Sequence, residues 1–285
     1  MRRHIYKLLL SILTISIVLG CSKSDDVSAP VEGLGGEVLP KNNLDAWLNT
    51  NFTQPYNIEV KYRWDPYEVP LEKTLVPPFI SQVQPIMQAV KSIWIEPYVK
   101  EAGADFVKKF CPKQYVLVGS PNYNSDGTIT LGTAEGGRKV VLFEVNNFSQ
   151  QNLDGVKFTL HVIHHEFGHI LHQNIAYPVA FKQITPGTYT SNWYNVSDAQ
   201  AYALGYITPY SMSGTDEDFV EMIATMLVEG KSGFDAIVEA IPSATGRAAI
   251  RQKEQIVITY FKQAYNIDFR SLQTTTQAAI ANYVK

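Results

Sequence analysis

Residues 161–173 read HVIHHEFGHILHQ, and they constrain the fold more than any other part of the chain. Every histidine of the sequence except His4 falls in this segment. Apolar residues recur at helical spacing through it and just before it: Val156, Leu160, Ile163, Phe167, Ile170 and Leu171. Because they occupy several sides, they predict a buried helix, with Asp154 as its N-cap. The histidines of such a helix are not ordinary surface residues.

Within this helix, His165, Glu166 and His169 match the pattern H-E-x-x-H. Side chains four residues apart lie on one face of a helix, about one turn apart, so the two imidazoles can hold a single zinc ion. Zinc lowers the pKa of a bound water towards about 7, and Glu166 can take its proton and pass it to a leaving amine. The pattern predicts a catalytic zinc site suited to amide hydrolysis. The alternative is a helix whose histidines serve packing alone.

A catalytic zinc ion needs a third protein ligand, and the sequence offers Glu221. The metzincin pattern would place a glycine and a third histidine after the motif, where this chain has His172 and Ile175. Glu221 instead lies on a predicted helix among apolar residues, where an unpaired carboxylate is costly and zinc is a sufficient partner. These apolar neighbours are Phe219, Ile223 and Met226.

Three further acidic residues begin the same predicted helix. Asp216, Glu217 and Asp218 are interpreted as capping residues that favour the positive end of the helix dipole. Asp218 is the alternative third ligand, because GTDEDF is similar to the G-T-x-D pattern of aspzincins. The match is broken, since Glu217 occupies the fourth position.

A catalytic zinc site usually includes a donor that stabilises the developing oxyanion. Tyr202, Tyr206 and Tyr210 precede the Glu221 helix, and Tyr210 is the candidate, with core packing as the alternative for each. His161 and His172 are expected to pack or to contact solvent, with a hydrogen bond to the site as the alternative. His164 is expected to be structural.

The strand before the active-site helix is a second feature expected to contact substrate. The run KVVLFEVNNF, residues 139–148, stands in the position of the edge strand that pairs with an extended peptide in zincins. The alternative is an ordinary core strand, and one strand can serve both purposes.

The N-terminus has the features of a bacterial lipoprotein. Arg2, Arg3 and Lys7 precede an apolar run, residues 8–20, that is too short to span a bilayer. The run ends in VLGC, which resembles a lipobox and implies cleavage before Cys21 and lipid on that residue. Residues 1–20 are then a signal peptide and residues 21–43 a flexible tether. The alternative is an ordinary signal peptide followed by an incidental cysteine.

Two observations bear on location and partners. The segment KSDD after Cys21 resembles the acidic surface-export signals of Bacteroidetes lipoproteins, with a generic linker as the alternative. We therefore expect an outer-membrane lipoprotein that faces the cell surface. The alternative is an anchor on the periplasmic face of the same membrane. The net charge of −3, without a basic cluster, argues against nucleic acid as a partner.

Several of these segments together resemble known families. HEFGH followed by EDFVEMIA resembles the gluzincin metallopeptidases, notably lethal-factor-like ones. With the lipobox, IEVKYRWD and the C-terminal GRAAIRQKEQIVITYFKQAYNIDF, most of the mature chain resembles the substrate import-associated zinc metallohydrolase lipoproteins. The resemblance implies His165, His169 and Glu221 as zinc ligands and Glu166 as general base. The resemblance also implies that the protein acts beside a nutrient-import complex of the outer membrane.

The coarse order of elements predicts an α+β, zincin-like fold. The first half of the chain has strand patterns at 56–64, 114–120 and 138–145 and a helical pattern at 78–103. Between the last two strand patterns, residues 122–137 read as a turn, a short strand and a turn. The second half reads as loops followed by helices. We expect an upper subdomain, residues 44–173, with a twisted mixed sheet, a backing helix and the zinc helix. A helical lower subdomain, residues 174–285, carries the third ligand.

The sequence therefore predicts a surface-anchored zinc metallopeptidase that cuts peptides or proteins. The alternative from another class is a zinc-stabilised binding lipoprotein of an uptake system, without turnover. A third alternative is hydrolysis of a non-peptide amide or ester. An intact Glu166 favours an enzyme, because a protein that only binds has no need of a general base.

Overall fold

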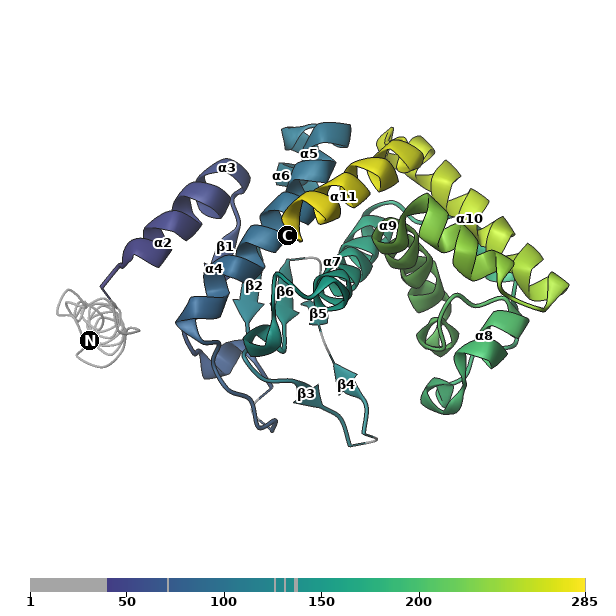
Figure 1. The fold of residues 1–285 in the computed structure, drawn as a ribbon, viewed down its shortest axis with the longest axis horizontal. Coiled ribbons are helices and arrows are strands. Elements are labelled where there is room, and N and C mark those ends of the chain that lie inside the picture. Colours follow the sequence, from purple (N-terminus) through teal and green to yellow (C-terminus); the bar gives the residue numbers. More distant parts are fainter. Residues whose placement is uncertain (1–39, 71, 126, 131, 136–137, 285) are drawn as a thin grey trace, which may run out of the picture. The chain divides into compact units, whose positions relative to one another are not determined.

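A small mixed sheet and a larger set of helices make up the fold (Figure 1). The computed structural model describes residues 40–284 except 71, 126, 131, 136 and 137. The predicted signal peptide, Cys21 and nearly all of the tether lie outside the described residues. Residues 43–285 form one compact unit. The predicted division of this unit at residue 173 stays a prediction.

The sheet has the strand order β1-β2-β6-β5. Strands β1, β2 and β6 are parallel, and β5 runs antiparallel to β6. Their bounds are Glu59–Lys61, Gln114–Leu117, Lys139–Leu142 and, for β5, Gly132–Glu135. A separate hairpin pairs β3, Asn122–Tyr123, with β4, Ile129–Thr130.

The expectation that residues 139–148 form the edge strand is wrong. Strand β6 occupies only Lys139–Leu142 and lies between β2 and β5, so its backbone groups are already paired on both sides. Among the described residues, β5 is the strand at this edge of the sheet. The short segment 132–135 contains two small residues and no long apolar pattern, which is why its strand character was weak in the sequence.

Helices form most of the rest of the unit. The predicted helix over 78–103 is a continuous helical run from Ile80 to Ala102, whose middle is π-helical. Two further helices, Asn43–Leu48 before this run and Ala104–Phe110 directly after it, were not predicted. The helical elements are α2 (Asn43–Leu48), η1 (Asn49–Thr53), α3 (Gln54–Tyr56), η2 (Pro66–Glu68), α4 (Ile80–Ala89), η3 (Val90–Ile95), α5 (Glu96–Ala102), α6 (Ala104–Phe110), η4 (Val145–Asn147), α7 (Leu153–Asn174), η5 (Val179–Gln183), η6 (Trp193–Asn195), α8 (Asp198–Leu204), η7 (Tyr210–Ser213), α9 (Thr215–Glu239), α10 (Ala244–Tyr265) and α11 (Phe269–Tyr283).

Helix α7 is the predicted helix that carries the histidines. With Asp154 as N-cap it would begin at residue 155, but it begins two residues earlier, at Leu153. Asn152 is the N-cap, and its side-chain oxygen accepts a hydrogen bond from the backbone N–H of Gly155. Asp154 lies in the first turn, where its charge favours the helix dipole. The asparagine caps well because its oxygen reaches an otherwise unpaired N–H, so the N-cap prediction was misplaced by two residues.

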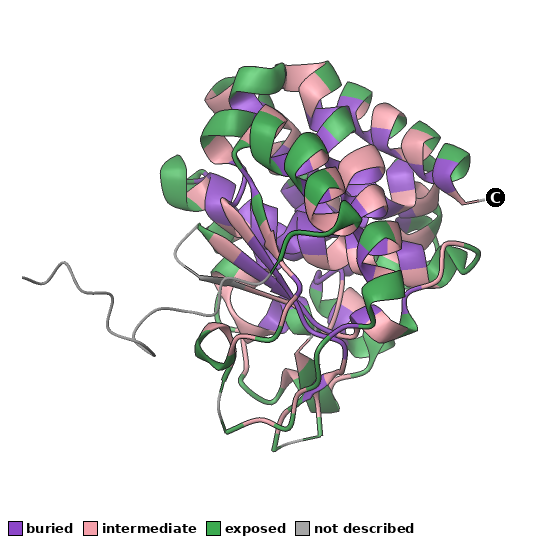
Figure 2. Ribbon diagram, turned by 90° about the vertical axis from the view of Figure 1, so that its left-hand side faces the viewer, coloured by how far each residue is buried: buried purple, intermediate pink, exposed green. Residues whose placement is uncertain are grey.

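The core lies between the sheet and the helices, and α7 runs through it. Figure 2 shows the buried residues along the strands and on the inner faces of the helices. Tyr115 and Leu142 of the sheet share one cluster with Phe167 of α7, whose ring packs edge-on against Trp94 at a centroid distance of 5.1 Å. This burial fixes the helix that carries the histidines, because large aromatic side chains contribute much of the core's free energy.

Helices α7 and α9 pack closely beside each other (Figure 1). A Cβ atom added to Gly168 of α7 would lie 2.9 Å from Cγ1 of Val220 of α9. Only glycine permits this approach without a shift. The contact brings the first turns of α9 against the middle of α7.

Helix α9 bends at Gly230, whose φ of 66° is outside the helical region. The bend frees backbone carbonyls, and α11 satisfies three of them. Gln273 donates to the carbonyl of Met226 at 2.6 Å, and Gln277 donates to those of Leu227 and Val228, each at 2.8 Å. The C-terminal helix therefore stabilises the helix that faces α7.

The observed architecture confirms the predicted α+β class, with a mixed sheet and a mainly helical second half. The finer zincin-like subdomain organisation stays a prediction. None of the helices in the part of the chain that the structure describes is both long and apolar enough to cross a membrane.

Candidate metal centre

Two helices from distant parts of the sequence supply the polar side chains of the centre. Helix α7 carries His161, His165 and His169, each four residues from the next and therefore on one face. Helix α9 carries Glu217 and Glu221, also four residues apart and directed at that face. His165, Glu166 and Glu221 are all buried.

The first group of side chains lies around one end of His165. Its Nε2 atom lies 3.2 Å from Nε2 of His169, so the two imidazoles of the motif face each other. Oε2 of Glu217 lies 3.1 Å from Nε2 of His165 and 3.3 Å from Nε2 of His169. Two imidazole nitrogens and one carboxylate oxygen thus converge on a common point, with the spacing and donor types to hold a cation.

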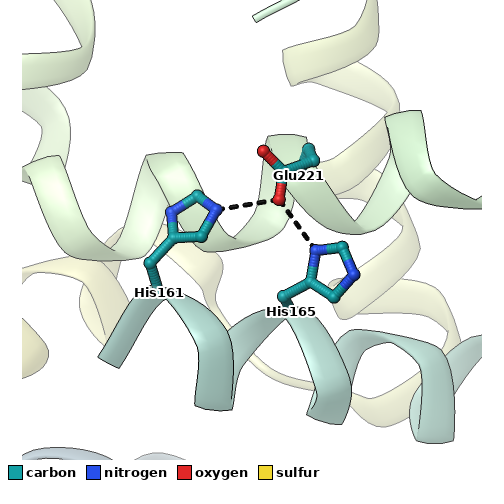
Figure 3. Close-up of side chains that lie close together, drawn as sticks. All are labelled: His161, His165 and Glu221. Carbon is teal, nitrogen blue, oxygen red and sulfur yellow. Dashed lines mark hydrogen bonds and ion pairs between the residues drawn. The ribbon is translucent and has the colours of Figure 1, made fainter. Parts of the chain in front are cut away.

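The second group lies at the other nitrogen of His165. Figure 3 shows the carboxylate of Glu221 between two imidazoles. Nδ1 of His165 and Nε2 of His161 each donate to Oε1 of Glu221 at 2.8 Å. The hydroxyl of Thr208 donates to Oε2 of the same carboxylate at 2.7 Å. These four side chains also include a donor set for a cation, His161, His165 and Glu221.

The predicted ligands His165, His169 and Glu221 are therefore divided between two groups. Glu221 contacts His165 at Nδ1, away from the nitrogen that faces His169. Glu217, interpreted in the sequence as a capping residue, occupies the place beside the two facing nitrogens. A signal for this was present, because Glu217 and Glu221 are spaced to lie on one helical face. Which of them reaches the motif depends on how α9 is positioned along α7.

Glu166 and Tyr210 border a cavity of about 360 Å³ beside these groups. Glu166 is 8% exposed, and the ring of Tyr210 lies 5.6 Å from that of His165. Tyr210 also packs edge-on against Trp193 at 4.8 Å, which keeps the phenol over the histidine. The hairpin residues Thr128 and Thr130 line the opposite wall. The structure thus brings both predicted catalytic side chains to the same cavity.

Electrostatics at the centre favour positive charge. Burial opposes protonation of His165, but hydrogen bonds to Glu217 and Glu221 outweigh it and raise the pKa of His165 to about 10. For Glu217, burial is outweighed by hydrogen bonds from His165 and His169, which hold the pKa of this carboxyl below its usual value. Burial, reinforced by the charge of Glu217, raises the pKa of the Tyr210 phenol. Such clustered shifts are typical of functional sites.

The other polar candidates lie elsewhere or have different partners. His172, expected to pack or to contact solvent, has Nε2 at 3.0 Å from Nδ1 of His169, so the alternative of a hydrogen bond to the site holds for it. His164 is fully buried, and burial lowers its pKa to about 3, as suits a structural residue. Asp218 does not approach the histidines, because it pairs with buried Lys253 at 2.6 Å. Tyr206 donates to the carbonyl of Thr185 and has no role at the cavity.

His161 is the residue whose position differs most from the expectation of packing or solvent contact. It lines the cavity and donates to Glu221, so the alternative of a hydrogen bond to the site holds. Its spacing of four residues before His165 was the signal for it. Sequence alone could not use that signal, because His161 contacts α9 rather than another residue of α7.

A protein family and a solved structure are similar to this chain. Residues 37–270 match the model of a family described as "Putative zinc-binding metallo-peptidase". A crystal structure of a "putative zinc-binding metallo-peptidase" from Bacteroides caccae is similar, with a TM-score of 0.72 and 33% sequence identity. The alignment covers 86% of this chain and 96% of that chain. No curated protein matches the chain.

Proposed function

Because the chain belongs to the zinc-binding metallopeptidase family whose model it matches, we propose that it hydrolyses peptide bonds at the centre between α7 and α9. The substrate is a peptide or an exposed segment of a protein. The observation that carries this proposal is the convergence of His165 Nε2, His169 Nε2 and Glu217 Oε2, which lie 3.1–3.3 Å from one another.

These three atoms fit zinc. Zinc has ligands at about 2.0–2.2 Å in a tetrahedral arrangement, which separates neighbouring ligand atoms by roughly 3.3–3.5 Å. The observed separations are close to that range, and the donor set of two imidazoles and a carboxylate is one that zinc prefers. We therefore propose His165, His169 and Glu217 as the zinc ligands, in place of the set with Glu221 that the sequence predicted.

Glu221 has a different role in this proposal. Its carboxylate accepts a hydrogen bond from Nδ1 of His165, which leaves the lone pair on Nε2 directed at the metal. Thr208 and His161 hold the carboxylate in turn. Such a partner fixes the tautomer and orientation of a ligand without contacting the ion.

The remaining side chains supply proton transfer and charge stabilisation. Bound zinc would supply a Lewis acid that acidifies a water molecule and polarises the substrate carbonyl. Glu166, the residue after the first histidine, takes the proton of the attacking water and delivers it to the leaving amine. Tyr210 is protonated at neutral pH, as any phenol with an ordinary or raised pKa is, and its hydroxyl donates a hydrogen bond to the oxyanion.

The test is cleavage of a broad peptide library by the zinc-loaded chain and by its Glu166→Gln variant. We expect cleavage by the wild type and at least about a 100-fold loss in the variant, since a general base contributes that much or more. Zinc content, measured on both, should be equal. Cleavage by neither would favour a protein that binds without turnover, and equal cleavage by both would remove Glu166 as the base.

We further propose that the protein is a lipoprotein anchored to the outer membrane through Cys21, facing the cell surface, and that it acts beside a nutrient-import complex. The support is the VLGC segment, the following KSDD and the family resemblance of the sequence. Labelling with a radioactive fatty acid in the native host tests the anchor. Label on the wild type but not on Cys21→Ser is expected, and label on neither would contradict it. Protease accessibility of intact cells separates the two membrane faces.

A further inference from the structure

A second cavity lies along α7, nearer to the N-terminal end of this helix than the metal centre is. It measures about 400 Å³ and is bordered by the end of β6, the turn that follows and the first turns of α7. Val162 of α7 lines this cavity and also the cavity that contains Glu166, so the two are neighbours on one face of the helix. A substrate that leaves the metal centre along α7 therefore meets this second cavity.

The walls of this cavity combine apolar side chains with the polar Asn147, Asn152 and Thr159, and the charged residues among its described lining are both acidic. Phe148, Phe158 and Val162 contribute to the walls, and Phe158 is 46% exposed although it is a large aromatic residue. Glu144 and Asp154 provide two carboxylates. We call this cavity, with these three apolar and two acidic residues, the acidic groove.

The two carboxylates are available to a cation. One oxygen of Glu144 accepts a hydrogen bond from Asn147 at 3.0 Å, and Asp154 is exposed in the first turn of α7. Among residues 40–284 that the structure describes, neither carboxylate has a Lys, Arg or His partner within ion-pair distance. Glu144 is held in place by its backbone, since its N–H donates to the carbonyl of Ser120 at 2.9 Å.

We propose that the acidic groove binds a lysine or arginine side chain of the substrate. Such a side chain has an apolar stem that packs on aromatic walls and a charged end that carboxylates bind, which matches both features of the groove. The inference rests on the proposed peptidase function and adds a substrate class to it.

The position of the basic residue follows from the length of α7. Phe158 and Asp154 precede Glu166 by about 12 Å and 18 Å along the helix, at a rise of about 1.5 Å per residue. An extended peptide advances about 3.3 Å per residue. The groove is therefore reached about four to five residues from the bond that is cut.

The experiment uses alanine–serine dodecapeptides that carry one lysine at successive positions, and the same set with norleucine, which has the apolar stem alone. We expect lysine at one position, about four to five residues from the cut bond, to raise kcat/KM about threefold to tenfold over norleucine, as for two partly exposed charge pairs. The double variant Glu144→Gln/Asp154→Asn should lose this preference. The matched control Glu72→Gln/Asp105→Asn removes two exposed carboxylates that line neither cavity, and it should keep the preference.

Two outcomes overturn the proposal: no preference for lysine at any position, or the same preference in both double variants. Binding separates its failure from that of the peptidase function. If the wild type cuts none of the peptides, fluorescence anisotropy with the labelled peptides and the zinc-loaded chain decides. Tighter binding of lysine than of norleucine, lost in Glu144→Gln/Asp154→Asn, would support the groove while the peptidase proposal falls. Equal binding of both would contradict the groove.

Discussion

At the scale of single residues, His165 has a different partner at each ring nitrogen. Nε2 faces His169 and Glu217, and Nδ1 donates to Glu221. One imidazole cannot direct both nitrogens at the same ion. In the proposed zinc site the two glutamates therefore differ in role, although both are buried or half-buried and lie on one face of α9.

This difference predicts two unequal losses of zinc affinity. Glu221→Gln should weaken zinc binding by about 10- to 100-fold, as is typical when the hydrogen-bond partner of a ligand is changed. Glu217→Gln should weaken it by more, because a ligand atom is replaced by a poorer one. Competition with a chromophoric chelator measures both.

Thr208→Val is the matched control, because it removes one hydrogen bond to Glu221 and changes no ligand. Its zinc affinity should lie nearest the wild type. The reverse order, with Glu221→Gln as the weakest binder, would return the third-ligand position to Glu221.

Tyr210 gives a prediction that separates turnover from binding. Tyr210→Phe keeps the ring that packs on Trp193 and His165 but removes the hydroxyl. If this hydroxyl stabilises the oxyanion, kcat should fall by about 100- to 1,000-fold, with little change in zinc content or KM. Steady-state kinetics on one cleaved peptide measure this. Unchanged kcat would exclude Tyr210 from the reaction.

At the scale of elements, the packing of α7 on α9 positions Glu217 beside the histidines. The helices approach each other closely at Gly168 and Val220, one residue before His169 and one before Glu221. Any change in their separation or relative translation moves the carboxylate away from the imidazoles. The small residue in the motif is therefore part of the geometry of the site.

Gly168→Ala should lower both stability and zinc affinity. The added methyl group would lie 2.9 Å from Cγ1 of Val220, and overpacking of this kind costs about 1–3 kcal/mol. Thermal unfolding and chelator competition measure the two effects. The double variant Gly168→Ala/Val220→Ala provides space for the methyl group and should recover part of the zinc affinity. No recovery would mean that the contact with Val220 is not the cause.

At the scale of the whole molecule, a buried ion pair joins the C-terminal helices to the metal centre. Lys253 of α10 and Asp218 of α9 lie 2.6 Å apart, and both side chains are fully buried. Lys253 also donates to the carbonyl of Gly205 at 2.8 Å, and Asp218 accepts from Tyr189 at 3.0 Å. The pair thus connects α10, the segment before η7 and the residue next to Glu217.

Lys253→Met should destabilise the fold by about 3–5 kcal/mol, because it leaves Asp218 buried without its cation. Chemical denaturation measures the change. Lys253→Met/Asp218→Leu removes both charges and should be more stable than the single variant, since an apolar pair avoids the cost of a buried unpaired charge. A double variant less stable than Lys253→Met would contradict this explanation.

Much of the fold was predictable where the signal is local. The long helices α7, α10 and α11 have strong apolar periodicity, and β2 and β6 are short apolar runs. One short strand was predicted within residues 122–137, where the structure has β3, β4 and β5. Helices α2 and α6 were missed because they are short, so their backbone conformation depends on neighbours far away in the sequence. The N-cap of α7 was misplaced for a different, local reason, because Asn152 and Asp154 lie two residues apart and either side chain could serve.

By itself, the sequence determined the pair of imidazoles and the place of Glu166 beside them, because His165, Glu166 and His169 lie on one helix and a helix fixes the relative positions of its own side chains. It also predicted that a carboxylate of a later helix, Glu221, would lie near this pair. Only the tertiary structure decided that Glu217, and not Glu221, lies beside the facing Nε2 atoms of His165 and His169. These residues differ by one helical turn, and the choice depends on the position of α9 along α7, which the close contact at Gly168 sets.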